Sequence, residues 1–250
     1  MSLESDVANL VTKAETLIAY FNGKKTSIDA AVAAAIAAVP ETSRTWYVDQ
    51  VVGSDANPGT QAAPFKTIAK AITSTPKSGI CTVYVTNDYD MTVNIASACS
   101  LLYIIGVVVN GVKPKLKPKY LVSDDGSNTN MTGLNLYMTA NYIGLKDFKI
   151  SLPSPAGIVP APNNTRAGAF FRGFSGVNIP ASFNISLESV DVEKTADWFG
   201  SFIGLTSSSL VLSVNACTFP SDFAGRYVSN VAAGALTKDL GHVVCNLASL

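Results

Sequence analysis

Residues 45–72 decide the fold, because their sequence TWYVDQVVGSDANPGTQAAPFKTIAKAI joins a short strand, a turn-rich segment and an amphipathic helix. The aromatic and β-branched run 46–48 is typical of a strand, and the Gly, Asn, Asp and Pro residues between 53 and 59 favour tight turns. Pro64 suits a first helical position. The apolar residues that follow recur at helical spacing, which predicts a helix with one apolar face that a sheet must cover: Phe65, Ile68, Ala69 and Ile72.

This segment resembles the amino-terminal cap of pectin-lyase-like right-handed β-helix proteins, in which a short helix covers the open end of the coil. The motif YVD…GSDxNPGTxxxPFKTIxxAI carries the resemblance over residues 46–72. The resemblance implies a mainly β fold, a right-handed parallel β-helix whose cap spans residues 41–79.

Short strands separated by polar turns follow from Ile80 to the end of the sequence. Their irregular spacing fits β-helix coils that carry corner loops of different lengths, although a β-sandwich would also give many short strands. We expect a short β-helix body over residues 80–250. Four runs place an apolar residue at every second position, and each reads as one strand: 143–150, 185–192, 212–219 and 243–247.

The amino-terminal segment, residues 1–40, has the pattern of helices that join chains. Val11 and Ile18 widen its apolar stripe beyond the needs of a two-stranded coiled coil, which favours a trimer or docking onto a larger surface. Val7 at an a position with leucine at d would alone favour a dimer. The stripe itself has heptad spacing: Leu3, Val7, Leu10, Ala14, Leu17 and Phe21.

Two short helices are predicted in this segment. Gly23 is expected to end the first helix. Thr26 and Asp29 offer a capping box for a second, alanine-rich helix that Pro40 stops.

Short heptad and alanine-rich helices before a β-helix cap resemble the amino-terminal attachment region of bacteriophage tail fibres and tailspikes. The resemblance implies a homotrimer that contacts other virion tail or baseplate proteins, made in the cytoplasm of the bacterial host and located in the phage particle. It also implies bacterial surface polysaccharide as a candidate ligand. We therefore expect a structural and interaction protein of a virion rather than an enzyme.

The overall composition argues against several classes of partner. Lys plus Arg and Asp plus Glu number 18 each and charged residues make up only 14% of the chain, so bulk electrostatics favours neither nucleic acid nor an anionic membrane. No apolar run approaches the roughly 18 residues of a membrane span, and the start MSLESDVANL lacks the features of a secretory signal. The four cysteines are widely separated with no CxxC pair, so we expect no metal site and no cofactor.

The alternative function is that of a polysaccharide depolymerase, a glycoside hydrolase or lyase. Such β-helix enzymes commonly use paired carboxylates, and Asp191 and Glu193 lie two residues apart on one expected strand face, with Glu188 nearby on the opposite face. Solvent-facing alternation explains these residues equally well, so we assign no catalytic residue. The only histidine, His242, is expected at a corner or strand edge.

Two further stretches are candidates for ligand contact. Lysines alternate with Pro and Leu over residues 113–119, which suits either binding of phosphates or uronates or protection of an exposed strand edge. The Pro/Gly/Asn-rich segment 153–176 is long enough to carry recognition, although its rings would also pack under the loop or between chains. Its candidates for glycan contact are Asn163, Asn164, Phe171, Arg172 and Phe174.

Overall fold

The computed structural model describes residues 2–38, 42–137, 142–174, 181–206 and 208–250. The chain divides into two compact units, residues 1–41 and residues 42–250, and each is described by itself.

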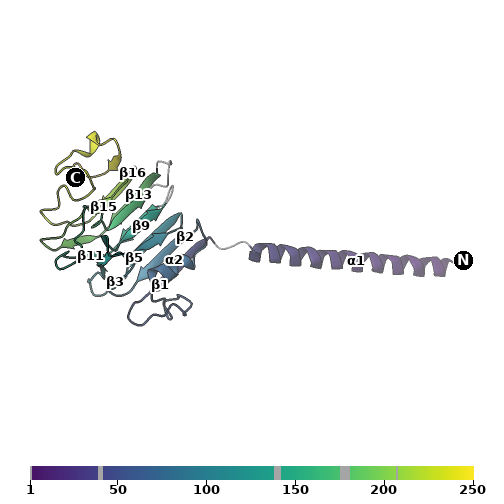
Figure 1. Cartoon of the computed structure of the whole chain (residues 1–250). Helices are drawn as coiled ribbons and strands as arrows, with labels where there is room; N and C mark the ends of the chain where they lie inside the picture. Colours follow the sequence, from purple (N-terminus) through teal and green to yellow (C-terminus); the bar gives the residue numbers. More distant parts are fainter. Residues whose placement is uncertain (1, 39–41, 138–141, 175–180, 207) are drawn as a thin grey trace. The chain divides into compact units, whose positions relative to one another are not determined.

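The first unit is a single helix, α1 (Leu3–Ala38), of 36 residues (Figure 1). The predicted break at Gly23 and the capping box at Thr26 are therefore wrong. The Thr26 hydroxyl donates to the Asn22 carbonyl at 3.0 Å, one turn back in the same helix. Glycine costs about 1 kcal/mol relative to alanine inside a helix, and the alanine-rich sequence after it offsets that penalty.

The second unit is a coil of parallel strands that visits three sheets in a repeating order, the architecture of a parallel β-helix (Figure 1). Sheet 1 contains β1 (Ser43–Val48), β2 (Ile80–Val85), β5 (Leu101–Gly106), β10 (Tyr142–Lys146), β13 (Ala181–Glu188), β16 (Ser208–Asn215) and β17 (Val243–Cys245). Sheet 2 contains β3 (Tyr89–Met91), β6 (Lys115–Pro118), β11 (Lys149–Leu152) and β14 (Asp191–Lys194). Sheet 3 contains β4 (Ile95–Ser97), β9 (Leu134–Tyr137), β12 (Phe171–Phe174) and β15 (Ile203–Gly204).

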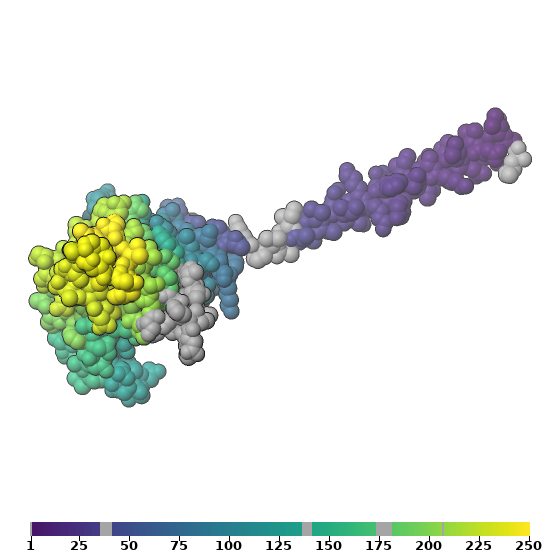
Figure 2. All heavy atoms as spheres, turned by 90° about the horizontal axis from the view of Figure 1, so that it is seen from above, coloured from purple at the N-terminus to yellow at the C-terminus, as the bar shows by residue number. Residues whose placement is uncertain are grey.

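Besides the cap helix, a strand pair and a short helix of this unit lie outside the three sheets. The antiparallel pair β7 (Tyr120–Val122) and β8 (Thr129–Met131) forms a separate two-stranded sheet. A short 3-10 helix, η1 (Thr237–Asp239), precedes β17, and the last residues of the chain gather over one face of the unit (yellow in Figure 2).

The core consists of rows of buried side chains that stack in register from one coil to the next. In sheet 1 the strand pairing aligns one row across five strands: Val83, Ile104, Leu145, Leu187 and Val214. A parallel row in sheet 3 contains Ile95, Leu134, Phe171 and Ile203. Burial of each such side chain contributes about 1.5–3 kcal/mol.

Three of the predicted strands are wrong, because the chain bends within each of them at the corner that follows sheet 1. Runs 143–150, 185–192 and 212–219 were each expected to form one strand, but each bends at a single residue in the left-handed region. These residues are Asp147, Ser189 and Ala216, with φ of 57°, 55° and 51°. The buried positions change parity at each bend, as from Ile143 and Leu145 to Phe148 and Ile150, so strict alternation stops at the corner and does not run through it.

The cap helix α2 (Ile68–Thr73) is shorter than predicted. Thr67 is its N-cap, and the Thr67 hydroxyl accepts from the Lys70 amide at 3.1 Å. Phe65 is extended, because its amide donates to the Tyr47 carbonyl at 2.9 Å and its carbonyl accepts from the Asp49 amide at 2.9 Å. Pro64 is therefore not the first helical residue, although the expected apolar face is present and buried at Ile68, Ala71 and Ile72.

Asp55 ties the turn-rich segment to the start of α2. Its carboxylate accepts hydrogen bonds from the Lys66 amide at 3.0 Å, the Thr67 amide at 2.9 Å and the Thr67 hydroxyl at 2.9 Å. Gly59 has a φ of 76° and a Cβ there would lie 2.4 Å from the Phe65 ring, so only glycine fits this turn.

We predict that Asp55→Ala lowers the free energy of unfolding by about 1–2 kcal/mol, the usual effect of removing a capping side chain. Urea unfolding followed by tryptophan fluorescence measures the change. Asp124→Ala, at an exposed turn position, serves as the matched control and should change stability by less than about 0.5 kcal/mol. Equal effects of the two substitutions would contradict this role of Asp55.

Candidate functional site

The helix α1 presents an uncovered apolar seam. Every side chain described between residues 3 and 35 is exposed. Because the helix does not break at Gly23, the heptad frame continues beyond Phe21 to Ile28, Ala31 and Ala35, with Lys24 at the d position and Lys25 at the e position in between. The seam includes large apolar residues that are at least half exposed: Leu3, Val7, Leu10, Val11, Leu17, Ile18, Phe21, Ile28 and Val32.

A helix in water seldom exposes an apolar seam of this width. Most helical stability in proteins comes from packing of the apolar face rather than from helix propensity. Leu10 is 69% exposed and Phe21 is 61% exposed. Contiguous exposed apolar surface of this kind is typical of protein or membrane interaction sites.

The outer face of sheet 2 brings together two of the three carboxylates proposed as catalytic. Asp191 and Glu193 lie on β14 beside the lysines of β6 and β11. The Lys113 ammonium lies 2.9 Å from Asp191, and the Lys149 ammonium lies 2.7 Å from Glu193. Lys115 is 3.5 Å from the same Glu193 carboxylate, so both acids are engaged in ion pairs.

The net effect of these neighbours is to lower both pKa values. For Asp191, partial burial raises the pKa, but hydrogen bonds from Thr218 and Lys113 lower it further than burial raises it. For Glu193, burial is likewise outweighed, here by hydrogen bonds from Lys149 and Ser151. A general acid for glycoside hydrolysis needs a raised pKa, so this environment is unsuited to that role.

The third candidate, Glu188, lies apart from this pair. It ends β13 in sheet 1, where its strand register places it beside Lys146 and its carboxylate lies 2.7 Å from the Lys146 ammonium. The structure therefore does not assemble Glu188, Asp191 and Glu193 into one site.

The lysine row over residues 113–119 is paired rather than free to bind anions. Lys117 lies 2.6 Å from Asp88, and Lys119 lies 3.8 Å from Asp90. With the Asp191 and Glu193 pairs, the outer face of sheet 2 is a ladder of alternating charge that has little net attraction for phosphates or uronates.

Two of the residues proposed for glycan contact are buried. Phe171 is 0% exposed and packs edge to face against Phe202 at 5.4 Å between ring centroids. Arg172 is 4% exposed, and its guanidinium donates to Asn135 at 3.2 Å and also to Asn94. Both residues therefore support the core, and the expectation that they contact a glycan is wrong.

Of the other three candidates for glycan contact, two lie on the surface, and the side chain of the third lies outside the described residues. Asn163 and Asn164 are exposed, and their side-chain amides hydrogen-bond each other at 2.6 Å. The backbone of Phe174 belongs to β12, but its side chain lies outside the described residues.

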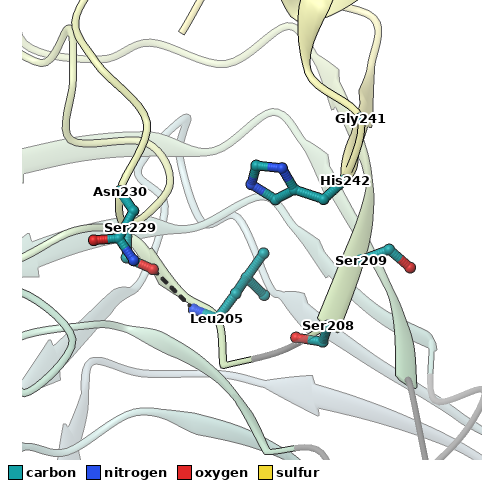
Figure 3. A pocket seen from close by; sticks show the side chains of 7 residues that line it. All are labelled: Leu205, Ser208, Ser209, Ser229, Asn230, Gly241 and His242. Carbon is teal, nitrogen blue, oxygen red and sulfur yellow. Dashed lines mark hydrogen bonds between the residues drawn. The ribbon is translucent and has the colours of Figure 1, made fainter.

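His242 lies immediately before β17, at the strand edge that the sequence predicts, and it borders a pocket that sequence reasoning missed (Figure 3). Residues from three separated stretches form this pocket, so no local motif indicates it. It is lined by Leu205, Ser208, Ser209, Ser229, Asn230, Gly241 and His242.

The remaining chemistry-bearing residues form no cluster in the described parts of the chain. Within those parts, no three or more His, Cys, Asp or Glu side chains come together as a metal site. All four cysteines are free thiols, and Cys81 and Cys99 are buried. Among the described helices, none combines the length and apolar character needed to cross a membrane.

Comparison with known proteins gives one family match. A family model described as "Protein of unknown function (DUF1565)" matches residues 51–94, which include the turn-rich segment after β1, the helix α2 and the strands β2 and β3. No curated protein matches the chain.

The solved structures that match part of this chain include a lacto-N-biosidase and a rhamnogalacturonan lyase. A GH136 lacto-N-biosidase from Eubacterium ramulus is 16% identical with a TM-score of 0.42, and the match covers 70% of this chain and 34% of that one. A rhamnogalacturonan lyase is 14% identical with a TM-score of 0.37, covering 70% of this chain and 56% of that one. The chain thus spans only about a third and just over half of their lengths, and such distant likeness carries no argument about its activity.

We predict that the Asp191 and Glu193 ion pairs make stability fall on the acid side. Both folded pKa values are depressed, so their contribution is present above the unfolded values near about 3.9 and 4.3 and is lost as pH falls through the folded values. Asp191→Asn with Glu193→Gln should cost about 0.5–2 kcal/mol at pH 7 because the pairs are partly exposed, and less at about pH 3, which is below the unfolded pKa values. Urea unfolding at both pH values checks this, and an equal loss at both would contradict the ion-pair account.

Proposed function

We propose that this chain is a structural and interaction protein of a bacteriophage virion, a trimeric fibre or spike in which α1 joins three copies and the β-helix body is displayed. The observation that carries the proposal is the exposed apolar seam of α1, whose large apolar residues extend from Leu3 to Val32. Three copies of α1 packed in parallel would cover the seam of each.

The width of the seam favours three helices over two. Besides the a and d positions, the e positions Val11, Ile18 and Val32 are apolar and exposed. A helix with apolar residues at a, d and e has a broader contact face than the narrow a/d stripe of a two-stranded coiled coil. At about 1.5 Å per residue, α1 is about 54 Å long and provides about five heptads of contact.

Burial supplies the free energy for this association. Each Leu, Ile or Phe of the seam that moves from water into the bundle contributes about 1.5–3 kcal/mol before the entropic cost of association. The seam's small residues Ala31 and Ala35 permit close approach of the helices at their carboxyl ends.

The virion assignment is supported by the combination of elements along the chain. Heptad residues, an alanine-rich stretch and a β-helix cap occur in the order typical of phage tail fibres and tailspikes. The low charge content also suits a chain whose surface is partly covered by its own copies and by tail or baseplate proteins. We accordingly propose synthesis in the bacterial cytoplasm and a final location in the phage particle.

The pairing of the carboxylates favours this function over that of a depolymerase. Asp191 and Glu193 are ion-paired with lowered pKa values, and Glu188 lies on another sheet. A fibre or spike that holds or presents a surface requires no general acid.

The seam is tested by paired double substitutions in the full chain. Leu10→Asp with Leu17→Asp places charge at two d positions, and we predict that the solution mass falls from three chains to one while the β-sheet circular dichroism remains. The matched control, Thr12→Asp with Ala19→Asp, adds the same charge on the opposite face of α1 and should remain trimeric. A trimer in both double variants, or a single-chain mass for the unsubstituted protein, would overturn the proposed assembly.

The enzymatic alternative has its own test. Incubation of the unsubstituted protein with capsular polysaccharide and lipopolysaccharide, followed by a reducing-end assay, should show no turnover. Turnover that Asp191→Asn with Glu193→Gln abolishes without unfolding the protein would establish the depolymerase function instead.

A further inference from the structure

The pocket beside His242 arises where the last two coils of the β-helix diverge. The earlier of these coils contributes Leu205, directly after β15, and Ser208 and Ser209 at the start of β16. The later coil follows closely as far as Ser229, whose amide donates to the Ile203 carbonyl at 2.8 Å. The chain then leaves the stack over residues 231–241 and returns at His242, whose carbonyl accepts from the Leu210 amide at 2.8 Å. A pocket of about 470 Å³ lies between these stretches of the two coils.

The described residues that line the pocket are all uncharged. Its polar groups are hydroxyls, one amide and one imidazole, and Leu205 provides an apolar surface. None of its lining residues is Asp, Glu, Lys or Arg, in contrast to the charged ladder on sheet 2. Its volume lies within the range of about 300–1,000 Å³ that is usual for small-molecule sites.

Several of these polar groups have hydrogen-bonding capacity left over. Ser229 is 5% exposed and its hydroxyl accepts from the Leu205 amide at 3.0 Å, which leaves its own proton available. The Ser208 hydroxyl is buried at the pocket wall without a hydrogen-bond partner. A buried hydroxyl without a partner costs free energy, so these groups are more typical of a binding site than of a closed corner.

The side chains of Asn230 and His242 face the same space. Figure 3 shows the His242 ring extending towards Ser229 and Asn230 above Leu205, whereas the Ser209 hydroxyl points to the other side. Asn230 has a φ of 63°, a left-handed conformation that costs free energy for a residue with a side chain. Asparagine tolerates this conformation better than most residues, and here it keeps an amide at the pocket wall.

We propose that this pocket binds a neutral pyranose sugar. The Asn230 amide and the His242 imidazole each offer both a donor and an acceptor, which matches vicinal hydroxyls that also donate and accept. The Ser229 hydroxyl adds a donor, and Leu205 contacts the apolar face of the ring. The absence of charge on the lining selects against uronates and sugar phosphates. All of the lining residues come from one chain, so the sugar site can be tested independently of the proposed trimer.

Saturation-transfer difference NMR with the full-length protein tests the pocket directly. The probes are the methyl glycosides of glucose, galactose and mannose, with glucuronic acid and glucose 6-phosphate as charged counterparts. We expect transfer to at least one neutral glycoside and little to its charged counterparts. No transfer to any neutral glycoside, or equal transfer to the charged sugars, would overturn the assignment.

A pair of matched substitutions separates binding from folding. Asn230→Gly removes the amide while glycine adopts the left-handed backbone without strain, so the variant should fold normally and bind at least about tenfold more weakly. The control is Asn110→Gly, an exposed asparagine with a φ of 52° that does not line this pocket and should leave affinity unchanged. Unchanged affinity in Asn230→Gly, or an equal loss in both variants, would overturn the proposal.

A neutral oligosaccharide shows whether the pocket binds a sugar residue within a glycan chain or a free sugar. Tighter binding of maltohexaose than of methyl glucoside would assign the pocket to a residue within a glycan chain, and the reverse would assign it to a free sugar. Either result requires the Asn230→Gly loss described above, so both support a sugar site at this pocket.

Discussion

The structure of the body depends on the registered stacking of inward-facing apolar rows from coil to coil. The apolar side chains of each coil are covered by the coils on either side, so only the two ends of the stack need a separate cover. At the amino-terminal end, α2 and Phe65 provide it, with Asp55 holding the turn that places them. Aromatic packing fills the last coils at the other end, where the stacked rings of Trp198 and Phe223 lie 5.9 Å apart. A body closed in this way leaves its outer faces free for recognition.

The two units differ in whether they bury their own apolar side chains. The body contains its own core, whereas α1 exposes every described side chain between residues 3 and 35. Because the hydrophobic effect penalises that exposure, we propose that α1 packs against partner chains. This contrast is the physical basis for assigning assembly to α1 and display to the β-helix.

The sequence indicates local elements better than it indicates which residues meet. The cap, the strand alternation and the heptad seam follow from short-range spacing and are present in the structure. The start of α2 was missed because Phe65 satisfies both a helical spacing and a strand pairing with β1. The ion pair between Lys113 and Asp191 joins residues 78 positions apart, and the pocket joins three stretches, so both depend on coil register that local patterns do not contain. Burial of Phe171 and Arg172 was likewise invisible, since an aromatic and basic run is equally typical of a binding loop.

The most direct test of the account is the solution mass, by multi-angle light scattering, of the whole chain and of a chain that begins at Thr42. The account predicts three chains for the whole protein and one for the shortened protein, with β-sheet circular dichroism retained in both. A single-chain mass for both proteins would contradict assembly through α1, and a trimer of the shortened protein would place the contacts in the β-helix body instead.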